Sequence, residues 1–163
     1  EIDHLSVCLP RNPFLETLDV PIDRRYATVR QETGLPDKGR LAQQGWVLPS
    51  EAEAARIMHR VRQKLPRCRY TGTLTDPADA YVRIRSVSTT HRYPEDSFGW
   101  HGHRIELTMF RDGERVSVST ALLLRRGPVL LALDYVNYRR EATEQRLRAY
   151  NLGILRKVLA NFV

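Results

Sequence analysis

The most distinctive chemical feature of the sequence is a pair of histidines separated by one glycine, in the tetrapeptide Trp100-His101-Gly102-His103. Residues i and i+2 of an extended strand project from the same face, so the two imidazoles are expected side by side. Solvation at a strand end is the simplest interpretation, and a ligand cleft is the functional alternative. A metal site would need a third ligand, for which His91 is only a guess, and we predict none.

Carboxylates would be needed if these histidines took part in acid–base catalysis. Glu106 and Asp134 are the candidates, and with His101 and His103 they form the catalytic set of an enzyme hypothesis. Strand alternation places Glu106 on the face opposite the histidines, which argues against that pair. The chain contains no nucleophile-elbow serine and no glycine-rich phosphate loop, and we predict no cofactor.

Arginines and aromatic residues near the histidines add candidate ligand contacts. We expect Arg83 and Arg104 on the polar face of the sheet, together with Glu106 and Asp134. There the two guanidinium groups could clamp a carboxylate or phosphate, although a solvated face is the simpler interpretation. Aromatic residues in the adjoining loop could form an apolar rim or pack on the fold itself. The candidate ligand-binding residues are His91, Tyr93, Trp100, His101, His103, Arg83 and Arg104.

Three extended runs in residues 100–138 must position these side chains. Ile105 and Leu107 alternate with polar residues, the period of two expected of a half-buried strand. Asp112-Gly113 favours a tight hairpin turn, because glycine adopts positive φ at no steric cost. Gly127-Pro128 separates the second run from the third. The pattern predicts an antiparallel meander.

Two helices are predicted, one before and one after the strand-rich part of the sequence. Helix 50–65 begins with a capping box, in which the Ser50 hydroxyl accepts an amide and the Glu53 carboxylate reaches back. Helix 141–162 carries a regular apolar stripe. Gly153 interrupts it, and close packing on a neighbour would justify a glycine there.

The remaining segments are less regular. Residues 40–48 and 81–87 are predicted strands, and residues 70–78 are polar and rich in turn formers. The polar, aromatic segment 88–99 is predicted to be a loop that forms a rim or lid. Prolines interrupt residues 1–37, which we predict to be an irregular arm.

These elements predict an α+β fold, a mainly antiparallel sheet of about five or six strands with two main helices packed against it. At 163 residues the chain is expected to form one domain, with arm 1–37 and a helix–sheet core 40–163.

The composition, 42% hydrophobic and 28% charged, is that of a soluble globular protein. The net charge is +7, but the basic residues form no block and are not interleaved with exposed aromatic residues, so nucleic acid is not the expected partner. No apolar run reaches the length of about 20 residues that a membrane helix needs. The chain opens at Glu1 without a charged and apolar leader, as expected if a signal peptide has been removed or was never present.

Cys8 and Cys68 lie too far apart for a CxxC motif, so zinc is not expected. Two free thiols in a cytosolic protein and one disulfide in an exported protein are both compatible with the sequence. The need to fasten the N-terminal arm is a mild argument for the disulfide.

The order of these anchor residues resembles the PknH-like extracellular sensor domains of actinobacteria, which occur on receptor kinases and as free-standing lipoproteins. Cys8 precedes the strand and turn Gln43-Gln44-Gly45-Trp46-Val47-Leu48-Pro49-Ser50, and the alanine-rich helix Glu51–Leu65 ends at Cys68. Arg125-Arg126-Gly127-Pro128-Val129-Leu130-Leu131 then leads into an apolar strand and a closing helix. The resemblance extends from Cys8 to about Phe162.

The resemblance implies an exported or cell-surface domain with a Cys8–Cys68 disulfide and a cleft over the sheet that binds a small ligand. Many members of that family have a second disulfide, for which this chain has no cysteines. The resemblance also favours an extracellular or cell-surface location over a cytoplasmic one, after removal of a signal peptide or lipid anchor.

Three functions follow as hypotheses. The first is a sensor-type domain that captures a small molecule near residues 88–104. The second is a cofactor-independent enzyme on the same scaffold, for example in a biosynthetic pathway, with acid–base residues among His91, His101, His103, Glu106 and Asp134. The third is an interaction module whose basic face meets a cell-wall component or a partner protein.

Overall fold

The computed structural model describes residues 2–6, 19–23, 28–35, 39–65, 70–75, 81–93 and 98–162, and the side chains of 39–65, 89–93 and 98–162. A seven-stranded sheet in the order β3-β4-β9-β8-β7-β6-β5 forms its centre, and every neighbouring pair is antiparallel. The strands are β3 (Thr28–Leu35), β4 (Gly39–Val47), β5 (Tyr70–Thr75), β6 (Tyr81–Tyr93), β7 (His101–Arg111), β8 (Glu114–Arg126) and β9 (Val129–Asn137).

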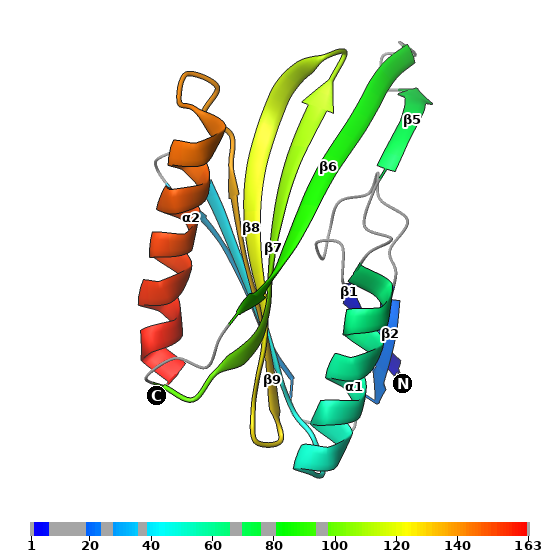
Figure 1. Ribbon diagram of the computed structural model, residues 1–163, viewed down its shortest axis with the longest axis vertical. Coiled ribbons are helices and arrows are strands. Elements are labelled where there is room, and N and C mark those ends of the chain that lie inside the picture. The colour runs from blue at the N-terminus through cyan, green and yellow to red at the C-terminus, as the bar shows by residue number, and fades with distance from the viewer. Residues whose placement is uncertain are drawn as a thin grey trace.

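Two helices cover opposite faces of this sheet (Figure 1). Helix α1 (Glu51–Lys64) follows β4, and α2 (Glu144–Leu159) follows β9 and continues into the short 3-10 helix η2 (Ala160–Phe162). Two further strands, β1 (Ile2–Ser6) and β2 (Asp19–Asp23), pair with each other and lie beside α1 (Figure 1). Among the described residues, no helix has the length and apolar character needed to cross a bilayer.

The predicted fold class, an α+β fold with an antiparallel sheet and two helices, is confirmed. The sheet has seven strands instead of five or six, because both of its edge strands, β3 and β5, lie in stretches predicted to be irregular or turn-rich. An edge strand pairs on one side only, so it tolerates residues that normally mark turns.

The prediction that residues 1–37 are irregular is wrong, since they contain β1, β2 and β3. Pro21 lies inside β2, where it pairs opposite His4. Both strands of a two-stranded sheet are edge strands, so a residue without an N–H is accommodated there.

Residues 88–93, predicted to belong to a loop, form the end of β6. They pair with β7 up to Tyr93, which lies opposite Gly102. The polar character of the segment suggested a loop, but Thr89 and Thr90 are β-branched and suit an extended strand that a neighbour completes. Of the predicted rim or lid, residues 94–97 lie outside the described part of the chain.

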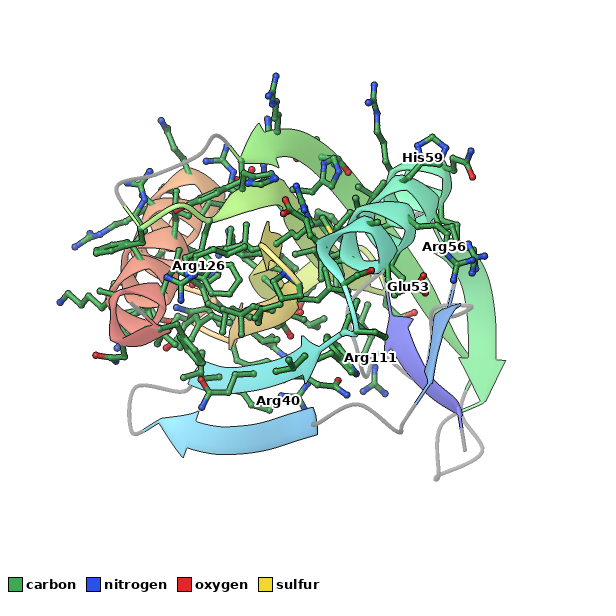
Figure 2. The ribbon with its side chains drawn as sticks, turned by 90° about the horizontal axis from the view of Figure 1, so that it is seen from below. Arg40, Glu53, Arg56, His59, Arg111 and Arg126 are labelled. Carbon is green, nitrogen blue, oxygen red and sulfur yellow. The ribbon has the colours of Figure 1, made fainter. Side chains whose placement is uncertain are left out.

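Helix α1 begins as the capping pattern predicts. The Ser50 side chain accepts a hydrogen bond from the Glu53 amide at 3.1 Å. The Glu53 carboxylate does not reach back and instead accepts from Arg56 Nε at 3.0 Å, and Figure 2 shows the two side chains together on α1. This ion pair lowers the pKa of Glu53.

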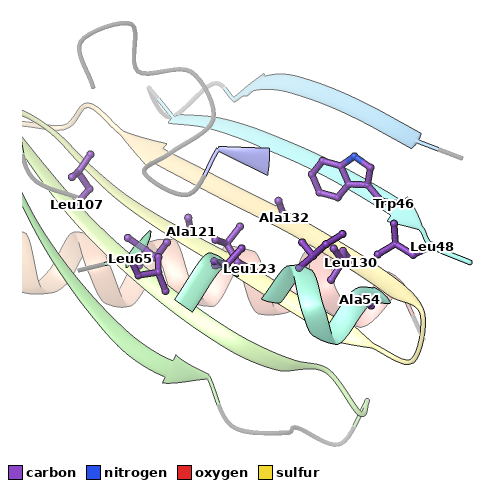
Figure 3. Packing of buried hydrophobic residues seen from close by; sticks show 12 residues of the cluster. Trp46, Leu48, Ala54, Leu65, Leu107, Ala121, Leu123, Leu130 and Ala132 are labelled. Atoms are coloured by element: carbon purple, nitrogen blue, oxygen red, sulfur yellow. The ribbon is translucent and has the colours of Figure 1, made fainter. Parts of the chain in front are cut away.

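The core is divided into two layers by the sheet. On the α1 side, Ala54, Ile57 and Val61 of the helix pack on apolar residues of β4, β7, β8 and β9. Trp46 and Leu48, at the end of β4, close one end of this layer (Figure 3).

On the α2 side, Leu155 and Leu159 pack on Leu122, Leu133 and Tyr135. The buried row of α2 is Leu147, Asn151, Leu155 and Leu159. The apolar pattern predicted Leu147, Tyr150 or Asn151, Ile154, Val158 and Phe162, so the first two positions agree and the next two differ by one residue. The predicted close packing at Gly153 is wrong, because the residue is exposed and a Cβ there would meet no atom within 4 Å.

Candidate functional site

A cleft of about 770 Å³ lies between α1 and the adjoining ends of β6, β7 and β8. Three arginines and four histidines line it, and no acidic residue does within the part of the chain that the structure describes. Its apolar wall includes Ala55, Met58 and Leu65 of α1. The cleft therefore combines an apolar surface with a high density of nitrogen-bearing side chains.

Helix α1 contributes one continuous row of side chains to the cleft: Ala55, Met58, His59 and Arg62. Spacings of three and four residues bring side chains to one helical face, next to the row that packs in the core. The same helix thus uses one stripe for the core and the adjacent stripe for the cleft. The sequence pattern placed Arg62 away from the apolar face of the helix, and this second stripe is the signal that would have found it.

His101 and His103 both line the cleft, as their spacing predicts. They lie on the same face of β7 as Ile105, which is buried in the core layer under α1. Gly102 between them is required by close approach to β8, because a Cβ there would lie 2.1 Å from the Leu123 carbonyl oxygen.

Arg125 fixes the orientation and tautomer of His101. The Arg125 Nη2 atom lies 3.1 Å from His101 Nε2, and Arg125 Nη1 donates to the Glu51 carboxylate at 2.9 Å. A guanidinium group only donates hydrogen bonds, so His101 Nε2 must accept and the ring proton lies on Nδ1. This Nδ1 atom is shielded from solvent and has no hydrogen-bond partner in the described part of the chain.

His103 is held in its neutral form. Partial burial lowers the pKa of His103 below its ordinary value of 6.5, and the charges of Arg62 and Arg92 lower that pKa further. His103 therefore presents an uncharged imidazole to the cleft at neutral pH.

The third metal ligand considered from the sequence is not brought to the histidine pair. His91 borders the cleft, but it pairs with Arg104 across the strands, and its Nε2 lies 3.7 Å from Glu106 Oε2 on the α2 side of the sheet. Within the described ranges, no group of three His, Cys, Asp or Glu side chains could hold a metal ion.

Glu106 belongs to the α2 face, so the sheet separates it from His101 and His103 as alternation predicts. Arg148 of α2 donates to Glu106 Oε2 at 2.9 Å, and Arg104 Nε lies 3.3 Å from Oε1. This face was expected to be solvated, but α2 covers it and Glu106 is only 7% exposed. The buried carboxylate is thus a structural partner of α2.

Asp134 lies on the α1 face and not, as predicted, on the opposite one. It pairs with Ala121, which in turn pairs with Ile105 of the histidine strand. Two strand spacings separate its Cα from β7 by about 10 Å, and Asp134 does not line the cleft. The structure therefore does not join Asp134 to the histidines.

The remaining candidates divide between core and cleft. Tyr93 borders the cleft and packs in the α2-side core, whereas Trp100 is buried in that core with the Arg126 guanidinium 4.8 Å from its ring centroid. Figure 2 shows Arg126 on the side of the molecule that carries α2.

Arg83 lies in β6, eight residues before His91 and therefore about 26 Å along the strand from it. Its side chain lies outside the described residues, but this separation places its backbone far from Arg104, which pairs with His91. The predicted clamp of Arg83 and Arg104 on one anion is thus not formed by neighbouring residues. Arg62, Arg92 and Arg125 are the basic residues of the cleft, and sequence reasoning selected none of them.

Comparison with known proteins gives one structural neighbour to report. No protein-family model matches the chain, and no curated protein matches it. The chain is similar to the crystal structure of the extracellular domain of PknH from Mycobacterium tuberculosis, with a TM-score of 0.48 and 13% sequence identity. The match covers 81% of this chain and 66% of that chain, so this chain spans slightly less than two thirds of its length. Membership of the PknH-like family stays a prediction.

Proposed function

We propose that the protein is a ligand-binding domain that captures a small molecule in the cleft between α1 and β6, β7 and β8. The observation that carries this proposal is the cleft itself, whose volume of about 770 Å³ lies within the range of small-molecule sites. An apolar helix stripe faces convergent polar side chains across it, which is the usual composition of such sites.

The arrangement of the histidines favours binding over acid–base catalysis. A general base in such a pair is usually oriented by a carboxylate, but Glu106 lies across the sheet and Asp134 two strands away. The Nε2 atom of His101 already accepts a hydrogen bond from Arg125, with 3.1 Å between the nitrogens.

The proposed setting follows the sequence resemblance: an exported or cell-surface sensor-type domain whose partner is a small molecule. A cell-wall component or a partner protein is the alternative partner, under the interaction-module hypothesis.

Native mass spectrometry of the protein from its own producing organism tests the proposal. We expect a reproducible added mass that disappears on denaturation. Ala55→Trp, which fills the cleft from α1, should abolish the added mass. Ala149→Trp introduces the same side chain at an exposed position of α2 and should leave it unchanged. An added mass that persists in Ala55→Trp, or a clean apo mass together with no binding of the probes described below, would contradict the proposal.

A further inference from the structure

The charge on the wall of the cleft is positive and is only partly balanced. Of the three cleft arginines, Arg125 has a partner, because it donates to Glu51 at 2.9 Å. Arg62 and Arg92 are exposed and form no hydrogen bond or ion pair with any residue that the structure describes. Two guanidinium groups are thus available to a molecule in the cleft.

These two arginines line the same cleft as His103. Arg92 of β6 pairs directly with His103 of β7, and Arg62 lines the same cleft from α1. Both charges act on His103, so the two guanidinium groups and the ring share one part of the cleft. Like charges that line one cleft repel one another, and a bound anion would offset that repulsion.

The wall also holds a hydrogen-bond donor without a partner. The contact with Arg125 places the His101 proton on Nδ1, and this shielded N–H has no acceptor among the described residues. Because the atom is shielded, a ligand oxygen could accept from it only after the imidazole ring turns, so this donor does not define the ligand.

The apolar part of the wall faces the same space. Met58 and Leu65 come from α1, at spacings that bracket Arg62 on the helix. A ligand that contacts both Arg62 and these side chains must be charged at one end and apolar at the other. A small inorganic anion would leave this apolar surface uncovered.

We infer that the ligand of the cleft is an apolar molecule that carries an oxyanion, either a carboxylate or a phosphate. This inference rests on the proposed function and narrows it to a chemical class. Arg62 and Arg92 bind the oxyanion, because guanidinium groups match its geometry and charge. Met58 and Leu65 contact the apolar part.

Four probes with the same alkyl chain test the inference: decanoate, decyl phosphate, decanol and decylammonium. Their affinities would be measured by isothermal titration calorimetry below the concentration at which they form micelles, at low and at high ionic strength. We expect at least one of the two anions to bind about tenfold more tightly than decanol, and decylammonium to bind more weakly than decanol. The preference for the anion should shrink at high ionic strength. Comparison of the two anions then distinguishes a carboxylate ligand from a phosphate ligand.

Matched variants locate the effect. The double variant Arg62→Gln, Arg92→Gln should lower the affinity for the preferred anion about tenfold and leave that for decanol unchanged. Arg156→Gln removes a charge from an exposed position of α2 and should change neither affinity.

The inference is overturned if decanol or decylammonium binds as tightly as the anions, or if the double variant keeps the preference for the anion. In both cases a small molecule still binds, so the proposed function stands. Failure of all four probes also overturns the inference, and native mass spectrometry then decides the proposed function independently through the presence or absence of a co-purified ligand.

Discussion

The contact between Arg125 and His101 shows how one residue outside the histidine pair controls the chemistry of the cleft. Arg125 is bound on one side by Glu51 of α1 and on the other reaches the imidazole of β7. One guanidinium group therefore connects the start of α1 to two strands of the sheet. The connection holds the helix over the cleft and fixes the tautomer of His101 at the same time.

Replacement of Arg125 should weaken the attachment of α1 to the sheet and release the tautomer of His101. In Arg125→Met, His101 Nε2 loses its donor, so we expect both neutral tautomers in place of one, visible in the imidazole ¹⁵N chemical shifts. Loss of two charge-assisted hydrogen bonds at a partly buried site should lower the free energy of unfolding by about 1–2 kcal/mol. Arg156→Met is the exposed control. Retention of a single Nδ1–H tautomer in Arg125→Met would contradict the role of Arg125.

His103 should make the stability of the protein depend on pH. Burial first, and then Arg62 and Arg92, lower the pKa of His103 in the folded state below 6.5. The unfolded chain therefore binds more protons as the pH falls through that value, and the stabilisation present above it is lost. Between about pH 7.5 and 5.5, the wild type should lose more unfolding free energy than His103→Gln, which cannot titrate. Chemical denaturation at several pH values measures this, and parallel curves for the two proteins would contradict it.

At the scale of elements, the two helices have different relations to the same sheet. Helix α1 packs on it with an apolar stripe and leaves a cleft beside that stripe. Helix α2 packs more completely and brings Arg148 to the buried Glu106 carboxylate, while Asn151 donates to the Val118 carbonyl at 3.1 Å. The polar residues of the α2 face thus form hydrogen bonds between α2 and the sheet, whereas polar residues of the α1 face line the cleft.

Gly153 of α2 gives an element-scale prediction. The residue is helical and exposed, and a Cβ there would meet nothing within 4 Å. Gly153→Ala should therefore raise the free energy of unfolding by about 1 kcal/mol, because alanine loses less conformational entropy in a helix. Urea denaturation measures the change. Gly102→Ala is the contrasting variant, since its Cβ would meet the Leu123 carbonyl oxygen and should destabilise the protein. A destabilised Gly153→Ala would mean that the glycine has a packing role.

At the scale of the whole molecule, the Cys8–Cys68 disulfide implied by the sequence resemblance lies outside the described residues. Protein isolated from an oxidising compartment without reductant should contain no titratable thiol under denaturing conditions. Reduction should lower the free energy of unfolding by about 4 kcal/mol, less any strain in the bond, because the bridge closes a long loop. Two titratable thiols in the unreduced protein would rule the disulfide out.

The strands from residue 100 onward illustrate how far local patterns reach. Three predicted features depend on residues close in sequence, and each is present: the alternation around Ile105, the Asp112-Gly113 turn and the Ser50 cap. β3 and β5 were not predicted, because an edge strand has a weak local signal and forms only when a distant neighbour offers its backbone groups. The end of β6 was not predicted as a strand for the same reason, since its partner β7 supplies the pairing.

The candidate site shows the same division. The sequence alone determined that His101 and His103 share one face of a strand and that Glu106 lies on the other, because side chains alternate along any extended chain. Only the tertiary structure decided that α1 covers the histidine face and α2 the Glu106 face, and that Arg62, Arg92 and Arg125 line one cleft on the histidine face. Periodicity gives each helix a face to bury but not the surface on which it is buried. That choice depends on contacts such as Arg125 with Glu51, which join residues 74 positions apart and exist only once the sheet and the helix have come together.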